Sequence, residues 1–431
     1  MPLLLHHLGR DTYGLYATLT AVVGYFGLLT VGSALTVPRH VADCAARGER
    51  EALRDFVSTY LVGHLAVGIV ALVAGAAAAP VLASRLLVPE TLRGLIAPAW
   101  LLVVASWALG LTAGLFQSLL TGFGEVHLAN LANAARTIFN LAVAAGVVWA
   151  GGDLVHLLLG FAAASVVASL SLFALVARRH PEIRPSFARA RWSTLRATAR
   201  PAGYYFLMQV AALVVMGTDN IVIGAFLGVG AVASYAVAFQ LWAAALAVLW
   251  SGVDALMPFF TRWDARGNVE ALRNAYLRAT SYAFAGSAVC AVALAGFGRV
   301  AIRVWVGPDL PIDERLLWVF AGMLVLATPI HTASLVLAAV GRHRAPAIGG
   351  SIEAVLNLAL SIALVRPLGL LGVALGTLLS AACTNAWIAP RAANRDLGIP
   401  GGIYLRRALL PGMLAGIALG AAAALGRILL R

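Results

Sequence analysis

The chain has 431 residues, of which 61% are hydrophobic and 11% are charged, and it carries a formal net charge of +13. Its mean hydropathy is +0.90. A soluble globular chain has about 25% charged residues, so this composition excludes a soluble protein and indicates an integral membrane protein. The placement of the basic residues explains the net charge, and we expect no nucleic-acid partner.

Charge-free stretches long enough to cross the ~30 Å hydrocarbon core of a bilayer recur along the chain. Eight are clear: Tyr13 to Pro38, Phe56 to Ser84, Gly94 to Gly124, Leu154 to Ala177, Ala279 to Gly298, Leu316 to Gly341, Pro367 to Pro390 and Ala408 to Gly426. Four more contain polar residues: one around Arg136, one from Pro201 through Asp219, one from Gly230 to about Thr261 and one around Glu353. We therefore predict an all-α polytopic membrane protein with about twelve complete transmembrane helices.

The basic residues, all 31 of them arginines, gather in alternate loops. Twenty-one lie in five segments, namely 39–54, 178–200, 260–278, 341–345 and 390–407, and the alternate loops and termini hold nine. Cytoplasmic loops of membrane proteins carry such an excess. These five segments are predicted to face the cytoplasm, and segment 178–200 is also expected to touch anionic lipid headgroups. The predicted location is the cytoplasmic (inner) membrane.

The sequence shows little that could support catalysis. Cys44, Cys290 and Cys383 have neither a disulfide pattern nor metal-ligand spacing, and we expect them to be packing residues. The sequence contains no phosphate-binding loop, nucleophile elbow or zinc-protease motif. We predict that the protein is not an enzyme and uses no cofactor or metal.

One amphipathic segment occurs twice. ARGEREALRD, starting at Ala46, returns as ARGNVEALRN, starting at Ala265, with seven of ten residues identical at a shift of 219. Shifts of 219, 217 and 216 align further pairs: Leu8-Gly9 with Leu227-Gly228, Tyr16-Ala17 with Tyr235-Ala236, Gly124 with Gly341, Asn140-Leu141 with Asn357-Leu358, and Leu159-Gly160 with Leu375-Gly376. Because the register drifts by only three residues, we predict an internal duplication.

Each copy holds six spans, so the two copies have the same orientation across the membrane. We predict two pseudo-symmetric six-helix lobes that face each other across a cleft. The predicted divisions are an N-terminal lobe at 1–177, a basic cytoplasmic linker at 178–199, a C-terminal lobe at 200–393 and an additional transmembrane helix at 394–431. Residues 1–8 align with the end of the span at 201–227, so the first helix of the first lobe is expected to be truncated.

Four ionisable residues lie within predicted spans: Arg136, Asp219, Asp254 and Glu353. A charge at the bilayer centre costs at least ~2.5–3.5 kcal/mol, which makes each a candidate functional residue. Polar residues share helix faces with them: Asn130, Asn133, Thr137 and Asn140 beside Arg136, Asn357 and Ser361 beside Glu353, and Gln209 and Asn220 beside Asp219. We predict that these stripes line the cleft. Arg136, Asn133, Asn140, Asn357, Gln209 and Asn220 are the predicted substrate-binding residues, and Glu353, Asp219 and Asp254 are the predicted ion-coupling residues.

A structural interpretation stays open for each of these residues. Arg136 and Glu353 could form a buried ion pair that joins the lobes. Asp219 and Asp254 could lie near helix ends, where water reaches them. His331, Gln117 and Gln240 are weaker candidates, because a single histidine in an apolar helix is more often a hydrogen-bonded core residue than a proton relay.

Three segments resemble a known family. They are LGRDTYGLYATLTAVVGYFGLLTVGSALTVPRHVA, TDNIVIGAFLGVGAVASYAVAFQL and GRHRAPAIGGSIEAVLNLALSIALVRPLGLLGVALGTLLSAA. These resemble the polysaccharide transporter family, the Wzx-type lipid-linked oligosaccharide flippases, over nearly the whole chain. The family belongs to a superfamily with the multidrug and toxin extrusion (MATE) transporters and the lipid II flippases, so the resemblance implies a MATE-like fold.

The resemblance also implies a function, namely alternating-access transport of an undecaprenyl-pyrophosphate-linked oligosaccharide during assembly of O-antigen or another surface polysaccharide. The implied partners are this lipid-linked substrate and membrane lipids, with a polysaccharide polymerase and other assembly proteins as further possible partners. A MATE-type antiporter would share the fold but would have an acidic coupling site and an aromatic-lined cavity. A membrane glycosyltransferase or polymer ligase would need a large external loop with catalytic groups, which this chain lacks.

Overall fold

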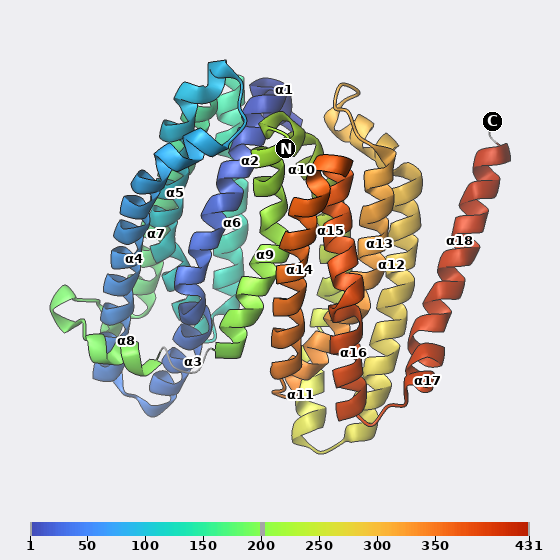
Figure 1. Cartoon of the computed structure of the whole chain (residues 1–431). Coiled ribbons are helices and arrows are strands. Elements are labelled where there is room, and N and C mark those ends of the chain that lie inside the picture. Colours follow the sequence, from blue (N-terminus) through green and yellow to red (C-terminus); the bar gives the residue numbers. More distant parts are fainter. Residues whose placement is uncertain (1, 199–202, 430–431) are drawn as a thin grey trace. The chain divides into compact units, whose positions relative to one another are not determined.

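The computed structural model describes residues 2–198 and 203–429, which form helices and connecting turns without a β-strand (Figure 1). Within these ranges, twelve helical stretches are long and apolar enough to cross a membrane. The four polar spans predicted around Arg136, Asp219, Glu353 and after Gly230 are all among them. The prediction of an all-α, multi-pass membrane protein is confirmed.

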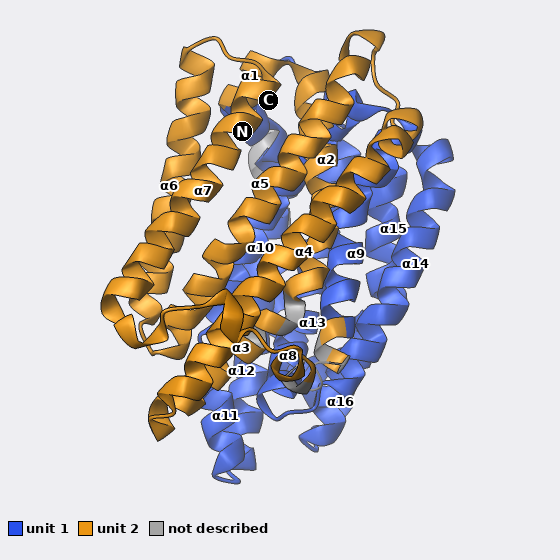
Figure 2. Cartoon of the chain, turned by 90° about the vertical axis from the view of Figure 1, so that its left-hand side faces the viewer, with its two compact units in different colours: residues 1–2, 207–431 blue, residues 3–206 orange. Residues whose placement is uncertain are grey.

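The chain divides into two compact units, coloured separately in Figure 2. Unit 2 comprises Leu3–Phe206, and unit 1 comprises Leu207–Arg431 with Met1–Pro2. Unit 2 contains α1 (Pro2–Leu8), α2 (Arg10–Gly24), η1 (Tyr25–Thr30), α3 (Val31–Arg47), α4 (Arg50–Arg85), α5 (Glu90–Gly122), α6 (Val126–Trp149), α7 (Leu154–Arg179), η2 (Pro181–Ile183), η3 (Phe187–Arg189) and α8 (Trp192–Thr198). The predicted span at 13–38 is therefore broken into two helices by the 3-10 turn η1.

Unit 1 follows a similar order of helices. It contains α9 (Gly203–Phe226), α10 (Val229–Asp254), α11 (Met257–Ala265), α12 (Val269–Val306), α13 (Glu314–Ala339), α14 (Arg344–Leu368), α15 (Leu370–Cys383), α16 (Asn385–Asp396), α17 (Gly401–Tyr404), the π-helical turn η5 (Leu405–Leu409) and α18 (Leu410–Leu429). Helix α18 lies against α12 through glycines, because a Cβ at Gly412 or Gly416 would meet α12 atoms within 3 Å. Small residues at such contacts let transmembrane helices approach closely.

The duplication is visible in the backbone. Helix α4 begins at Arg50 and α12 at Val269, a separation equal to the shift of 219 found in the sequence. The turns before them contain Gly48 and Gly267, with φ of 71° and 65°. Left-handed backbone favours glycine because it has no Cβ. Other positive-φ pairs follow nearly the same spacing: Gly9 with Gly228, Gly124 with Gly341, and Gly151 with Gly369.

Arginine-rich loops are joined to one another within each unit. In unit 2, Arg189 pairs with Glu51 and Asp55, which connects segment 178–200 to segment 39–54. In unit 1, Arg273 donates a hydrogen bond to the Leu397 carbonyl, and Arg342 pairs with Asp396 at 3.0 Å between Nη1 and Oδ2. The loops predicted to face the cytoplasm therefore lie together in each unit, as that topology requires.

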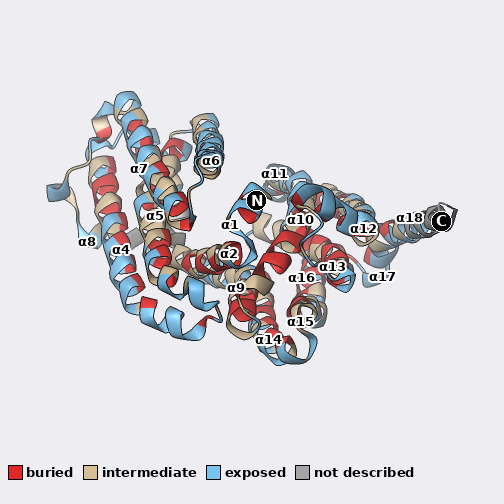
Figure 3. Cartoon of the chain, turned by 90° about the horizontal axis from the view of Figure 1, so that it is seen from above, coloured by how far each residue is buried: buried red, intermediate tan, exposed pale blue. Residues whose placement is uncertain are grey.

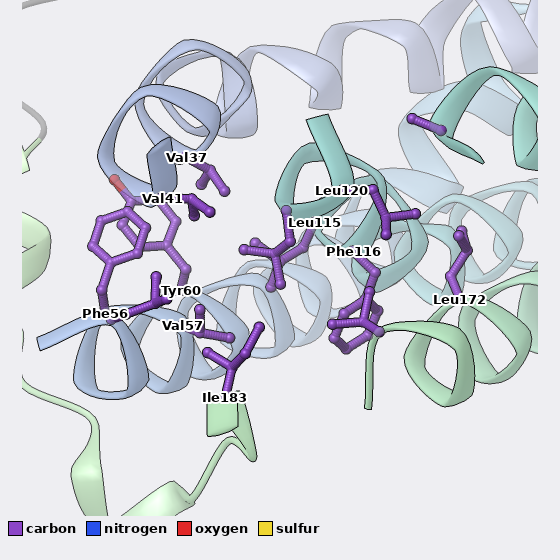
Figure 4. Close-up of a cluster of buried hydrophobic side chains, with 14 of the residues drawn as sticks. Val37, Val41, Phe56, Val57, Tyr60, Leu115, Phe116, Leu120, Leu172 and Ile183 are labelled. Carbon is purple, nitrogen blue, oxygen red and sulfur yellow. The ribbon is translucent and has the colours of Figure 1, made fainter. Parts of the chain in front are cut away.

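An apolar cluster packs α3, α4, α5 and α7 of unit 2 against one another (Figure 4). Phe56 and Tyr60 from α4 lie near Val37 and Val41 from α3, while Leu115 and Phe116 from α5 continue the cluster toward α7. Since apolar lipid offers no hydrophobic drive between helices, such close packing supplies much of their association. The cluster anchors these four helices and leaves α6 outside it except at its start.

Helix α6 is the most exposed long helix of unit 2. Of its described residues only Ala129 is buried, and Figure 3 shows the helix coloured mainly as exposed. Its counterpart in unit 1, α14, buries residues along its whole length: Pro346, Ala347, Gly349, Glu353, Ala354, Asn357, Ser361 and Val365. The two copies of the repeated helix therefore have different surroundings.

Candidate functional site

Unit 2 contains a cavity of about 570 Å³, here called the polar cavity. Its lining comes from α2, η1, α3, α4, α5, α6 and α7: Tyr16, Thr20, Val23, Thr30, Ser33, His64, Val103, Ser106, Trp107, Gly110, Leu111, Gly114, Ser118, Arg136, Asn140, Leu158, Phe161 and Ser165. Seven of the eighteen lining residues carry a hydroxyl group and Asn140 adds an amide, beside apolar residues such as Val103, Leu111 and Phe161. Among these lining residues Arg136 is the one arginine, so a single fixed positive charge faces the cavity.

Arg136 lies near the middle of its helix. It is ten residues from the start of α6, which at 1.5 Å per residue places it about 15 Å along a helix that crosses a ~30 Å core. Its Nη2 donates to Asn133 Oδ1 at 3.1 Å. A guanidinium has five N–H groups, so this bond orients the side chain and leaves donors for a ligand. Asn140, one turn further along α6, lines the same cavity.

Hydroxyl groups supply the rest of the polar wall. Ser33 Oγ lies 3.3 Å from His64 Nε2, and His64 Nδ1 is held by the Tyr60 carbonyl at 2.8 Å. Ser106 Oγ and Ser165 Oγ lie 3.3 Å apart on α5 and α7. A hydroxyl that donates within the protein can still accept a hydrogen bond. The cavity can therefore accept and donate hydrogen bonds to a hydroxyl-rich ligand at several points.

Unit 1 contains a polar cluster that is buried. Asp219 on α9 is 2% exposed, accepts a hydrogen bond from Tyr235 on α10, and accepts another from Thr377 Oγ1 on α15 at 3.4 Å. Asn357 on α14 is fully buried and donates from Nδ2 to Thr377 Oγ1 at 2.7 Å. Asp219 Oδ1 and Asn357 Oδ1 have no hydrogen-bond partner among the described residues. The cluster thus contains two unsatisfied oxygen acceptors, one from the carboxylate of Asp219 and one from the amide of Asn357.

Unit 1 also contains a cavity of about 230 Å³, and Glu353 lies in its wall. Glu353 is 8% exposed and shares this wall with Asn385 on α16. The same wall includes Trp242, Trp250 and His331. His331 Nε2 lies 2.7 Å from Asp254 Oδ1, and its ring stacks on Trp250 with centroids 4.1 Å apart.

The predicted residues thus fall into three places. Arg136 and Asn140 line the polar cavity, with Asn133 bonded to Arg136, while Asp219 and Asn357 share the buried cluster of unit 1. Glu353 lines the cavity of unit 1, and Asp254 contacts His331 in the wall of that cavity. Gln209 is exposed and Asn220 half-buried on α9, and neither is among the residues lining the cavities described here. The pairing of Arg136 with Glu353 would join the two units and stays a prediction.

Several site residues were absent from the prediction. Tyr235 and Thr377 hold Asp219, Asn385 shares a cavity wall with Glu353, and His64 and Trp107 line the polar cavity. One signal existed in the sequence, because Tyr16 and Tyr235 occupy equivalent places in the repeat and both lie at these sites.

Comparison with known proteins agrees with the fold. The uncharacterized membrane protein EpsK of Bacillus subtilis (strain 168) is 22% identical over 426 residues, which cover 95% of this chain and 82% of EpsK. An inward-facing MATE-family multidrug resistance transporter has a TM-score of 0.78 at 17% identity, covering 92% of this chain and 93% of that one. The lipid II flippase MurJ, in an inward closed conformation, has a TM-score of 0.74 at 15% identity, covering 100% and 96%.

The two structural likenesses confirm the predicted MATE-like fold. Residues 1–263 match the family described as polysaccharide biosynthesis protein. Since this match extends over more than half of the sequence, the chain belongs to the polysaccharide biosynthesis protein family.

Proposed function

We propose that the protein is a flippase that carries an undecaprenyl-pyrophosphate-linked oligosaccharide across the cytoplasmic membrane during assembly of a surface polysaccharide such as O-antigen. The observation that carries this proposal is the polar cavity of unit 2, where one guanidinium stands among hydroxyl and amide groups in a span of the membrane. Family membership and the likeness to a lipid II flippase support it. A polymerase and other assembly proteins would act on the product.

The chemistry of the cavity suits such a headgroup. Sugar and pyrophosphate must cross ~30 Å of hydrocarbon, where an unpaired polar group costs several kcal/mol. Arg136 can grip two phosphate oxygens at once. Asn140, Ser33 and the Ser106–Ser165 pair can exchange hydrogen bonds with sugar hydroxyls, and Trp107 offers an aromatic face.

The acidic residues of unit 1 are proposed to couple transport to an ion. Asp219 is the principal candidate, because its unpartnered Oδ1 and that of Asn357 provide acceptors for a proton or a small cation. Glu353 and Asp254 are further candidates, the second through its contact with His331. Binding at such a group drives a transition only if the two conformational states bind the ion with different affinities.

One observation favours a second function, that of a MATE-type antiporter for organic cations. The cavity beside Glu353 is lined by Trp242 and Trp250, and aromatic rings with a carboxylate suit a cation. Its volume of about 230 Å³ is below the ~300–1,000 Å³ typical of ligand pockets, whereas the polar cavity falls within that range. The flippase is therefore the better-supported function.

The test is a deletion strain complemented with variants. Loss of the protein should accumulate lipid-linked sugar on the cytoplasmic face and remove surface polysaccharide. Arg136→Ala should behave like the deletion at normal membrane abundance, and Arg136→Lys should restore part of the activity because a point charge lacks the bidentate fork. Arg93→Ala, at an exposed arginine of α5 paired with Glu90, is the matched control and should restore transport. Normal export by Arg136→Ala would overturn the assignment.

A further inference from the structure

A second cavity of unit 2, here called the apolar groove, adjoins the polar cavity. Its volume is about 450 Å³, and it is lined by residues of α5, α6 and α7, mostly apolar, with Gln117, Asn133, Arg136, Ser165 and Ser171 as the polar ones. Four of its lining residues also line the polar cavity: Gly110, Gly114, Arg136 and Ser165. The two spaces therefore meet along one wall, and Arg136 stands on that wall.

Most of the groove wall is apolar, and two of its polar side chains are engaged within the protein. Gln117 donates from Nε2 to the Ala129 carbonyl at 3.0 Å, and Asn133 Oδ1 accepts from Arg136. These amides are thus engaged within the protein. Ala113 and Leu172 belong to the groove and also to the apolar cluster of Figure 4, so the floor of the groove is the packed core of unit 2.

The attachment of α6 explains why the groove exists. Near its start, α6 is held to α5 by the bond from Gln117 to Ala129. Toward its end it contacts α7, where a Cβ at Gly160 would lie 2.5 Å from Val143 Cγ1. Between these two points the helix face at 132–139 borders the groove. In unit 1 the equivalent stretch of α14 buries Gly349, Glu353 and Ala354, and a Cβ at Gly349 would meet Asn385 of α16 at 2.7 Å.

We propose that the apolar groove holds the first isoprenoid units of the substrate's polyprenyl chain while the headgroup occupies the polar cavity. This rests on the proposed function. In a polyprenyl-pyrophosphate sugar, the negative charge lies between the hydroxyl-rich part and the hydrocarbon part. In unit 2 the guanidinium of Arg136 lies where a space with seven hydroxyl-bearing lining residues meets a space whose lining is mostly apolar. The order of the three chemistries is the same in ligand and protein.

The groove can hold only part of the polyprenyl chain. A volume of about 450 Å³ lies within the range of small-molecule pockets, ~300–1,000 Å³, so the remaining isoprenoid units stay in the lipid. The ordered segment next to the phosphate would keep the pyrophosphate within reach of Arg136. The groove thereby selects a lipid-linked pyrophosphate over a free sugar nucleotide.

Two neighbouring alanines of α6 allow a matched test. Ala135 lines the groove, whereas Ala134 lines neither cavity, and both side chains are exposed. Successive residues of a helix point about 100° apart, so Ala135→Trp fills the groove and Ala134→Trp places the same ring elsewhere. The full chain is purified in detergent, and the binding of undecaprenyl pyrophosphate and of phosphatidylglycerol is measured by native mass spectrometry. Arg136→Ala is measured in parallel.

We expect Ala135→Trp to weaken binding of undecaprenyl pyrophosphate at least tenfold and Ala134→Trp to change it less than twofold. Phosphatidylglycerol binding should be unchanged in both. If Ala135→Trp binds normally while Arg136→Ala does not, the headgroup site stands and the groove proposal is wrong. If Ala135→Trp displaces phosphatidylglycerol instead, the groove is a phospholipid site. Ala168→Leu on α7 narrows the groove from the opposite wall and gives the same comparison if Ala135→Trp does not fold.

Absence of undecaprenyl pyrophosphate binding to the unaltered chain would refute the proposed function itself. The groove proposal fails on a different result, in which undecaprenyl pyrophosphate binds the unaltered chain and the Ala135→Trp chain equally well.

Discussion

Removal of the hydroxyl that Tyr235 donates to Asp219 tests the buried cluster of unit 1. Both side chains are almost fully buried, and the other bond to the same carboxylate oxygen, from Thr377, is long at 3.4 Å. Tyr235→Phe keeps the ring and its packing against Phe320, whose centroid lies 5.5 Å away. The substitution therefore removes one hydrogen bond and little else.

The expected magnitude depends on whether Asp219 is charged in the folded protein. A hydrogen bond to a charged group contributes about 1.5–3 kcal/mol, against about 0.5–1.5 kcal/mol for a neutral pair. Tyr235→Phe should lower the free energy of unfolding by the larger amount if Asp219 is a carboxylate. In an Asp219→Asn background the same substitution should cost only the smaller amount. The difference is a coupling energy of about 1 kcal/mol or more, which corresponds to a factor of five or more in an equilibrium constant.

The assay is a double-mutant cycle on the free energy of unfolding in detergent. Tyr282→Phe, at an exposed tyrosine of α12, is the control and should change stability by less than about 0.5 kcal/mol. The same four chains are then assayed for transport over a range of sodium concentration and pH, where only those with Asp219 should respond to the ion. Additive effects within about 0.5 kcal/mol would refute the reasoning, because contacting residues in one network are expected to couple.

Three further predictions concern stability and topology. Asp153→Ala should lower the free energy of unfolding by about 1 kcal/mol because Asp153 caps α7. The backbone N–H of His156 donates to the Asp153 carboxylate and holds its pKa below the ordinary value. The stabilisation by Asp153 is therefore present at neutral pH and should vanish as pH falls through that lowered pKa. Gly160→Ala should cost about 1–3 kcal/mol by forcing α6 from α7, and Val143→Ala in the same chain should recover most of it; no recovery in thermal melts would contradict that contact. A cysteine at position 266, in a chain without its native cysteines, should react with an impermeant reagent only after lysis, and labelling in intact cells would refute the predicted orientation.

Much of the fold could be predicted from the sequence because the bilayer restricts what a chain can do. The transmembrane spans can be predicted from the length of apolar stretches and the absence of charged residues in them. Backbone polar groups within lipid must be satisfied inside a helix, so each such stretch is helical. The repeat was visible because turns need particular residues. Gly48 and Gly267 lie in left-handed turns and appear in the matched segments, whereas apolar helix residues exchange freely and blur the alignment.

The surroundings of each polar stripe could not be predicted in the same way. Periodicity shows which residues share a helix face, but it does not show what covers that face. Arg136 on α6 and Glu353 on α14 occupy equivalent places in the repeat, as do Asn140 and Asn357. Arg136 is exposed and Asn140 half-buried, whereas Glu353 and Asn357 are buried. The contacts that decide this come from other helices, as where Asn357 donates to Thr377 on α15, and helical periodicity does not identify such partners.

This difference between equivalent helices bears on how a duplicated protein divides its work. A flippase needs a space large enough for a sugar headgroup and a separate, dry site where one ion changes the balance between states. A helix with few buried residues, as α6 is, borders the space but lets water and lipid approach. A helix packed on its neighbours, as α14 is, excludes them and makes the charge of Asp219 sensitive to a proton or cation. Under the proposed function, one lobe could not provide both conditions in the same helix, whereas a duplicated lobe can, with the same polar spacing on α6 and α14 placed in different surroundings.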